Sequence, residues 1–252
     1  MKSKIQFIAD TKEMLDVLPR PYPAIDKLPD WLCKMPSYYG GEGKGVDDHG
    51  DPKTTIKKCM PVFDSMTAGY HIPLHTDVWV ENNGPDDIKV KWAWESIDVV
   101  SMHNPIQYDT YPIPDGYYSI GFKWINPWIV KTPPGWSTLF INPIHHDDLP
   151  FKCLTGVVDT DKYPNFVNFI FFLKKDFSGL IPKDTPMIQV IPFKRSDFKS
   201  EFSYDDGFLK QQWRKAHTVF FDRYKRFFRS HKKYEQGDVK KCPFAFLHNT
   251  SK

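Results

Sequence analysis

The stretch formed by residues 117–195 limits the fold of this chain more than any other part of the sequence. Its apolar and aromatic runs, of about four to eight residues each, are cut at short intervals by Pro, Gly, Asn and Asp, a pattern typical of short strands joined by tight turns. The whole chain has 22 prolines and 14 glycines in 252 residues, which also favours turns over helices. The sequence therefore predicts an all-β sandwich or barrel.

Similar runs begin upstream of this stretch. We count about eight strands, a number that favours a jelly roll or the related double-stranded β-helix of cupin-like barrels. In the run from residue 118 to 124, apolar and small or polar side chains alternate, as expected for a half-buried strand. The predicted strands are residues 70–80, 88–94, 97–100, 118–124, 136–141, 151–158, 166–173 and 187–193.

The first 58 residues are expected to wrap around this barrel. We predict a strand at residues 5–9, a helix that Thr11 caps, and one helical turn within the proline-rich segment at residues 30–35. The Gly- and Asp-rich residues 39–53 lack the spacing of a phosphate-binding loop and are predicted to form a flexible surface loop. The predicted division is an N-terminal wrap at residues 1–58, a β-barrel core at 59–198 and a C-terminal basic helix with a tail at 199–252.

In the C-terminal region, the spacing of apolar residues changes from that of strands to that of a helix. Ser203 and Asp206 resemble a capping box, and apolar residues then follow at spacings of three and four, which predicts an amphipathic helix of about 28 residues. Its charged face is basic, so it is a candidate contact for nucleic acid, an anionic surface or an acidic partner, although a simply solvated face has the same pattern. The basic residues are Lys210, Arg214, Lys215, Arg223, Lys225, Arg226, Arg229, Lys232 and Lys233.

The cysteines and the N-terminal residues indicate whether the protein is secreted or spans a membrane. The four cysteines occur singly, without the spacing of a zinc finger, and a chain of this length does not need a disulfide scaffold. The N-terminus has no apolar signal segment, and no run of about 18 apolar residues exists. A formal net charge of +3 does not by itself indicate a nucleic-acid-binding protein. We expect a soluble protein that is not secreted and has no membrane span.

The predicted strand at residues 70–80 carries the sharpest chemical candidate. His75 and Asp77 have the i, i+2 spacing that places both side chains on one face of a strand. Such an H-x-D pair supplies two ligands of a facial triad for non-haem Fe(II). We predict His145 as the third metal ligand, with His103 and His146 as alternatives. Arg195 is the predicted catalytic residue, as the anchor for a carboxylate such as that of 2-oxoglutarate.

Each of these residues has a structural alternative. The histidines and Asp77 also fit the solvated face of a half-exposed strand, or another kind of polar pocket. The pair Asp159 and Asp161 could serve acid–base chemistry, as paired carboxylates do in glycosidases. An Asp-Thr-Asp sequence after a strand more often stabilises its own turn, which is the role we expect here.

Four motifs resemble a known family. The segments KKCMPVFDSMTAGYHIP, TPPGWSTLFINP, LPFKCLTGVVDTDKY and GLIPKDTPMIQVIPFKR, within residues 57–195, together resemble an uncharacterised protein family of tailed bacteriophages, especially marine T4-like phages. A related domain of unknown function occurs in bacterial proteins. The resemblance implies a phage protein that acts in the cytoplasm of an infected host or on the virion, and it implies no activity. The segment IPKDTP also resembles a turn of dUTPase-type barrels, whose other motifs are missing here.

The sequence leaves two functions open. The first is a metal-dependent, cupin-like oxygenase that acts on a small molecule with Fe(II) and 2-oxoglutarate, through the residues named above. The second is a non-enzymatic binding or assembly module, which contacts a host or phage protein, or nucleic acid, through its basic C-terminal helix. The fold alone does not decide between them, because jelly rolls serve both purposes.

Overall fold

The computed structural model of this chain describes residues 4–40, 46, 53–94, 97–217, 224 and 228–230. The chain divides into two compact units. The first unit comprises residues 1–24 and 68–195, and the second comprises residues 25–67 and 196–252. The predicted core at residues 59–198 thus lies mostly in the first unit, whereas residues 59–67 and 196–198 belong to the second.

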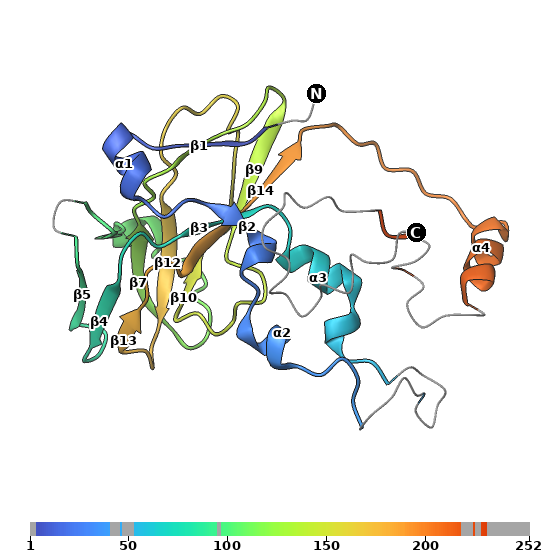
Figure 1. The fold of residues 1–252 in the computed structure, drawn as a ribbon, viewed down its shortest axis with the longest axis horizontal. Coiled ribbons are helices and arrows are strands. Elements are labelled where there is room, and N and C mark those ends of the chain that lie inside the picture. The colour runs from blue at the N-terminus through green and yellow to red at the C-terminus, as the bar shows by residue number, and fades with distance from the viewer. Residues whose placement is uncertain are drawn as a thin grey trace. The chain divides into compact units, whose positions relative to one another are not determined.

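The first unit is built of antiparallel β-sheets, so the predicted all-β class is confirmed (Figure 1). Every strand pair among the described residues is antiparallel, which fits the many short turns of the sequence. Its strands are β1 (Gln6–Ile8), β2 (Tyr22–Pro23), β3 (Tyr70–Pro73), β4 (Val78–Asn82), β5 (Ile88–Trp92), β6 (Val100–Met102), β7 (Tyr117–Trp124), β8 (Ile129–Lys131), β9 (Trp136–Ile141), β10 (Phe151–Cys153), β11 (Gly156–Val158), β12 (Phe169–Lys174), β13 (Gly179–Ile181) and β14 (Pro186–Lys194).

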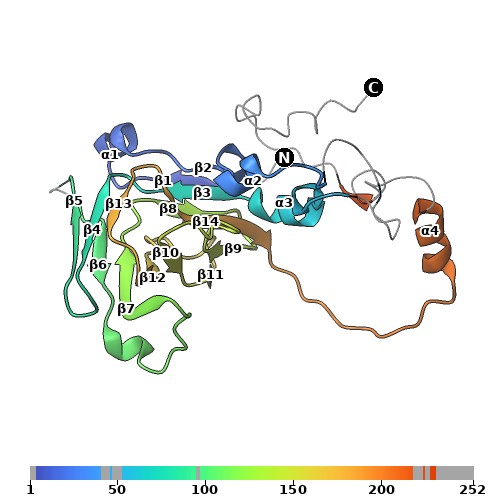
Figure 2. The ribbon, with the colours of Figure 1, turned by 90° about the horizontal axis from the view of Figure 1, so that it is seen from below.

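Two of the sheets enclose the hydrophobic core. One has the strand order β11-β9-β14-β3-β2 and the other β10-β12-β7-β6, and they form two layers (Figure 2). Phe140 of β9 packs against Phe169 of β12, with ring centroids 5.5 Å apart. Within the second sheet, the buried Trp124 stacks on Phe171 at 4.1 Å. Aromatic residues that the sequence placed on strand faces therefore fill the space between the sheets.

The chain crosses between these two sheets with short connections. Strands β9, β10, β11 and β12 belong alternately to the first and the second sheet. The single strand predicted at residues 151–158 is therefore wrong, since β10 pairs with β12 and β11 pairs with β9. The pattern of apolar residues is continuous through both strands, and only the pairing partners separate them.

The single strand predicted at residues 70–80 is also wrong. β3 pairs with β14, while β4 pairs with β13 and β5 in a separate three-stranded sheet. Between them the chain turns against the loop before β14, where the Leu74 amide donates to the Thr185 carbonyl and the Asp184 amide donates to the Leu74 carbonyl. The alternation of residues therefore does not run through the connection that carries His75 and Asp77.

Helices α1 and α2 confirm the local predictions for the N-terminal region. α1 (Lys12–Val17) begins after Thr11, whose hydroxyl accepts a hydrogen bond from the Met14 amide at 3.2 Å. In the second unit, α2 (Asp30–Lys34) is the predicted helical turn. The 3₁₀-helices are η1 (Ala24–Asp26), η2 (Ile56–Lys58) and η3 (Pro105–Tyr108).

Helix α3 (Met60–Met66) lies in the second unit, at the start of the segment predicted as β-barrel core. Its buried side chains, Met60, Phe63 and Met66, recur at a spacing of three, so they share one helix face. Asp64 on the same helix forms a two-pronged ion pair with Arg229, whose Nη2 lies 2.6 Å from Asp64 Oδ1. Arg229, predicted as part of a basic contact face, is therefore bound within its own unit.

The C-terminal helix begins later than predicted. α4 (Phe208–His217) follows Asp205 and Asp206, whose carboxylates accept hydrogen bonds from the first amides of the helix. The predicted capping box at Ser203 is wrong, because Asp205 is the better acceptor for the first turn. The rest of the predicted helix lies outside the described residues. Within those residues, no helix has both the length and the apolar character needed to cross a membrane.

Candidate functional site

His75 lies in the connection between β3 and β4 and is buried, with 1% of its surface exposed. Its ring lies 5.8 Å from that of Trp94, and neither ring nitrogen has a hydrogen-bond partner among the described residues. Burial, together with the positive charge of Lys183, lowers the pKa of His75 to about 4. The imidazole is therefore neutral near pH 7.

Asp77 and His145 lie in environments unlike that of His75. Asp77 accepts a hydrogen bond of 2.6 Å from the Lys183 amide, so its carboxylate fastens the connection to the turn before β14. His145 is exposed and lies in the turn after β9 with φ at 60°, a left-handed conformation. Its neighbour His146 is buried, but its ring packs edge-on against His71, with centroids 5.5 Å apart.

The described residues do not bring the predicted iron ligands together in a cluster. No group of three or more His, Cys, Asp or Glu side chains that could hold a metal ion occurs in the part of the chain that the structure describes. His103, the other alternative ligand, stacks on Tyr108 at 5.8 Å. The predicted Fe(II) and 2-oxoglutarate chemistry therefore finds no assembled ligand set here, and it stays a prediction for direct metal analysis.

Arg195, the predicted carboxylate anchor, binds carboxylates of its own chain. Its Nη1 and Nη2 donate to the two oxygens of Asp161, and Nη1 also lies 3.2 Å from Asp159 Oδ1. The Ser137 hydroxyl accepts from Arg195 at 3.0 Å and donates to Asp159 at 2.6 Å. We call Arg195, Asp161, Asp159 and Ser137 the Arg195 clasp. A 2-oxoacid would have to displace Asp161 to reach this guanidinium.

The clasp joins three segments at one end of the first unit. Asp161 follows β11, Ser137 lies in β9 and Arg195 follows β14, while the Gly135 amide donates to Asp161 at 2.7 Å. The hydrogen bond from Arg195 is the main reason that the pKa of Asp161 falls to about 2. The pair of Asp159 and Asp161 therefore has a structural role, but its carboxylates bind Gly135, Ser137 and Arg195 in other segments, and not only their own turn as the sequence predicts.

A second polar cluster was not foreseen from the sequence. His71 of β3 lies between Tyr22 of β2 and Gln189 of β14 in the strand register. The Gln189 side chain accepts from the Ile144 amide at 2.9 Å and donates to the Ala68 carbonyl at 2.8 Å. A glutamine inside the apolar run of β14 was the available signal, because a buried amide must be hydrogen-bonded. Its bonds fasten the loop after β9 to the sheet.

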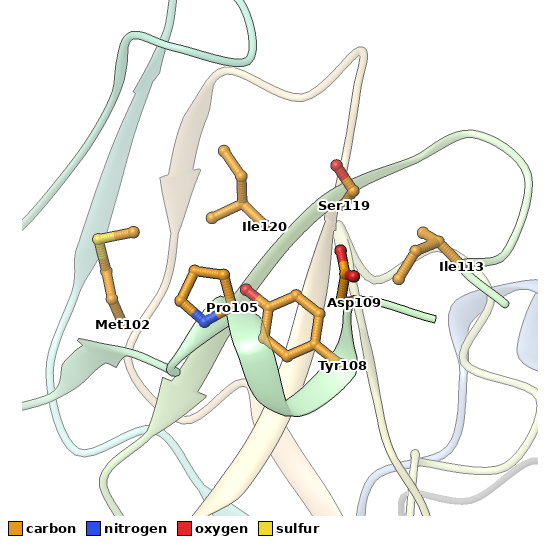
Figure 3. A pocket seen from close by; sticks show the side chains of 7 residues that line it. All are labelled: Met102, Pro105, Tyr108, Asp109, Ile113, Ser119 and Ile120. Carbon is orange, nitrogen blue, oxygen red and sulfur yellow. The ribbon is translucent and has the colours of Figure 1, made fainter. Parts of the chain in front are cut away.

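The first unit also holds a pocket between η3 and β7 (Figure 3). Its volume is about 320 Å³. We call it the η3 pocket. Asp109 and Ser119 contribute polar groups to its lining, whereas the apolar or aromatic part is formed by Met102, Pro105, Tyr108, Ile113 and Ile120.

Gly121 allows η3 to lie against β7. The Tyr108 hydroxyl accepts a hydrogen bond of 2.7 Å from the Gly121 amide, and Tyr108 is buried. A Cβ atom on residue 121 would lie 2.8 Å from the tyrosine ring, which is too close. An isolated glycine within a strand pattern marks such close approaches, so Gly121 was a usable sequence signal for this pocket.

One edge of β7 is only partly paired beside the η3 pocket. β6 pairs with residues 122–124 of β7, and the His103 amide donates to the Gly121 carbonyl. Residues 117–120 have no strand on that side within the described part of the chain, and their register against β12 shifts. The pocket therefore lies next to a segment of β7 that has a paired strand on one side only within the described residues.

The chain segment that forms the η3 pocket is apolar and acidic, whereas Lys174 and Lys175 lie beside residues 117 and 116 in the sheet. Ile106 is 84% exposed and Met102 is 65% exposed, which is unusual for such side chains close together. Residues 98–122 contain three aspartates, Asp98, Asp109 and Asp115, and no lysine or arginine. A ligand of this region would therefore present an apolar group with a positive charge beside it.

Comparison with known proteins assigns no family. No family model matches the chain, and no curated protein matches it. The chain is similar to a solved structure of a mutant dUTPase from phage phi11 of S. aureus, described with the coordination of a structural Mg(II) ion. The identity is 11%, the match covers 56% of this chain and 86% of that chain, and the TM-score is 0.30. A likeness of this size carries no argument about function.

Proposed function

We propose that this chain is a non-enzymatic binding or assembly module of a tailed bacteriophage, built on a jelly-roll-like scaffold. The observation that carries the proposal is the η3 pocket beside the half-paired strand β7. By contrast, the predicted catalytic residue Arg195 is engaged by Asp161. The module acts by docking a segment of a protein partner.

The size of the pocket favours a single side chain as the anchor. Ligand pockets for whole small molecules span roughly 300–1,000 Å³. At about 320 Å³, the η3 pocket lies at the lower end of that range. One aromatic or branched side chain of a protein segment fills such a space, while the backbone of that segment hydrogen-bonds to residues 117–120 of β7 as an added strand.

The charge around the pocket defines the chemistry of the docked segment. Asp109 lines the pocket and Asp115 follows on the same loop, without a basic residue nearby in the sequence. A lysine or arginine next to the anchoring side chain would complement this charge and accelerate association. We therefore propose a peptide segment with an apolar anchor and an adjacent basic residue as the ligand.

Peptide binding tests the proposed function. The probes are short fluorescent peptides with Phe flanked by Lys, Phe flanked by Glu, or Ala flanked by Lys, measured by anisotropy with the full chain. We expect the Lys-flanked Phe peptide to bind at least about tenfold tighter than the other two, equivalent to 1.4 kcal/mol. Equal binding of all three peptides, or no binding at millimolar concentration, contradicts the proposal.

Two variants locate the binding. Ser119→Trp places a large side chain in the pocket and should abolish binding of the Lys-flanked Phe peptide. Val157→Ser is the matched control, since Val157 is 60% exposed on the distant strand β11. The control should bind like the unmodified chain. Binding that survives Ser119→Trp would show that the η3 pocket is not the docking site.

The metal-dependent oxygenase is the second candidate, and buried His75 is the observation that favours it. Metal content should be measured after anaerobic loading with Fe(II), for the unmodified chain, His75→Leu and the control Val157→Ser. Stoichiometric iron that is lost only in His75→Leu would support the oxygenase and count against a purely binding role. Absence of bound iron in all three proteins would remove this candidate.

A further inference from the structure

The segment of residues 197–204, which follows β14 and Arg195, has the sequence pattern of a strand but is not part of a sheet. We call it the arm. Alternating polar and apolar positions are the signature of a half-buried strand. Within the described residues, no strand pairs with the arm. Its even positions include Phe198, Phe202 and Tyr204, and its odd positions are Asp197, Lys199, Glu201 and Ser203.

The three aromatic side chains of the arm are almost fully exposed. The exposed fractions are 91% for Phe198, 94% for Phe202 and 89% for Tyr204. Such a side chain buries roughly 150–250 Å² when it is covered, so three of them offer about 450–750 Å². A stable protein interface buries about 800 Å² on each partner. The arm alone thus supplies most of the surface that a specific protein contact needs.

The charges of the arm favour a protein as its partner. Residues 194–210 contain four basic side chains and four acidic ones, so their net charge is zero. One of the basic groups, Arg195, is already paired with Asp161. Nucleic acid and anionic lipid both require an excess of positive charge. A segment with aromatic residues and balanced charge instead suits an acceptor that has an apolar pocket.

We propose that the arm of one copy of this chain docks on the η3 pocket of a second copy, an inference that rests on the proposed docking function of that pocket. Phe198 has Asp197 before it and Lys199 after it. It fills the pocket because Lys199 meets the acidic lining residue Asp109. Phe202 lies between Glu201 and Ser203 without an adjacent basic residue, so it is the less favourable anchor. The arm backbone adds to residues 117–120 of β7.

Every copy then carries both an arm that docks and an η3 pocket that receives the arm of another copy. If two copies exchange arms reciprocally, the assembly closes as a dimer. If each arm binds the next copy in turn, the contact is heterologous and yields rings or filaments. In either arrangement, one intact arm and one intact η3 pocket are enough for a single contact. A variant with a defective arm can therefore still bind a variant with a defective pocket.

Sedimentation of the full-length chain over a range of concentrations tests the inference. We expect concentration-dependent self-association of the unmodified chain. The donor variant Phe198→Ser and the acceptor variant Ser119→Trp should each weaken it at least about tenfold, equivalent to 1.4 kcal/mol. The control Val157→Ser should associate like the unmodified chain. An equimolar mixture of the two defective variants should form a mixed dimer, since the intact arm of one fits the intact pocket of the other.

A peptide of residues 196–206 separates this inference from the proposed function. We expect it to bind the unmodified chain and not Ser119→Trp. If the Lys-flanked Phe probe binds the pocket while the arm peptide does not bind and the chain stays monomeric, the arm inference is wrong and the docking function stands. If neither peptide binds, both fail. Self-association that Phe198→Ser weakens but Ser119→Trp does not, or binding of the arm peptide to an oligonucleotide or to anionic vesicles instead, also overturns the inference.

Discussion

The Arg195 clasp and the η3 pocket differ in how completely their side chains are used by the fold. In the clasp, Arg195 and Asp161 satisfy each other, and the Asp161 side chain is only 5% exposed. At the η3 pocket, the lining residue Met102 stays exposed, and so does Ile106, which follows the lining residue Pro105 in the sequence. The residues that look reactive in the sequence therefore hold the structure together, whereas residues that look like core residues stay exposed and belong to the proposed binding surface.

This difference follows from the energetics of the two kinds of group. A charged pair taken out of water must be matched closely, so little of its hydrogen-bonding capacity remains for a ligand. An exposed apolar side chain keeps its full capacity to be buried, and a partner gains from covering it. Substitutions in both sites test whether this difference holds.

Removal of Asp161 should have the largest effect on stability. Asp161→Ala leaves Arg195 without its two-pronged partner and the Gly135 amide without its acceptor. We expect the Tm to fall by roughly 5–10 °C in thermal unfolding. Asp159→Ala is the matched control, because the Asp159 side chain is 51% exposed, and its Tm should change by about 2 °C at most. Equal losses in the two variants would show that the clasp does not depend on Asp161.

The dependence of unfolding free energy on pH should distinguish Asp161, which is paired with Arg195, from His75, which has no hydrogen-bond partner among the described residues. The folded pKa of Asp161 is about 2, below the usual value for an unfolded chain of about 3.9, so its contribution is present above pH ~4 and is lost as the pH falls toward 2. The folded pKa of His75, about 4, also lies below the unfolded value of about 6.5. The unfolded chain then binds the extra proton, and stability should decline from pH ~6.5 toward 4.

Two substitutions assign these pH ranges in urea unfolding experiments. His75→Leu should flatten the dependence between pH 4 and 6.5, and Asp161→Asn should flatten it between pH 2 and 4. The two ranges are therefore expected to respond independently. A profile that His75→Leu leaves unchanged would mean that another group titrates in that range.

Loss of the Tyr108 hydroxyl should have a moderate effect. Tyr108→Phe removes the acceptor of the Gly121 amide, a buried hydrogen bond worth about 1 kcal/mol, so the Tm should fall by about 2–4 °C. Gly121→Ala instead forces the tyrosine ring away from β7 and should weaken peptide binding more than Tyr108→Phe does. If Gly121→Ala binds peptide normally, the position of η3 does not form the site.

Ile106→Ser should have the smallest effect on stability and a clear effect on docking. Because Ile106 is 84% exposed, we expect a change in the free energy of unfolding within about 0.5 kcal/mol. Binding of the Lys-flanked Phe peptide should nevertheless weaken several-fold, as measured by anisotropy. A large loss of stability would show instead that Ile106 belongs to the core, which would remove the contrast with the clasp.

Local patterns predicted much of the fold. The strand predicted at residues 136–141 matches β9, and Thr11 caps α1 as expected. The alternation at residues 118–124 matches most of β7. In these segments, the identity of a residue and its near neighbours fixes the backbone conformation, so no knowledge of distant parts of the chain is needed.

The candidate site was far less predictable. His75 and Asp77 have the spacing of two ligands on one strand, yet β3 ends at Pro73, opposite Pro186, where its antiparallel partner β14 begins. The partner of Arg195 lies 34 residues earlier in the chain, and the acceptor of the Gly121 amide lies 13 residues away. Such pairings depend on how strands are ordered in the sheets, which short-range patterns do not specify.

A fold made of sheets of short strands was predictable from the sequence alone, because alternating side chains and turn residues act over a few positions. Which polar residues stabilise the fold, and which apolar residues stay exposed, became visible only in the tertiary structure. That decision depends on burial, and burial is set by the packing of segments far apart in the sequence. Arg195 and Ile106 show both outcomes, since the charged residue is engaged by its own chain and the apolar residue faces solvent.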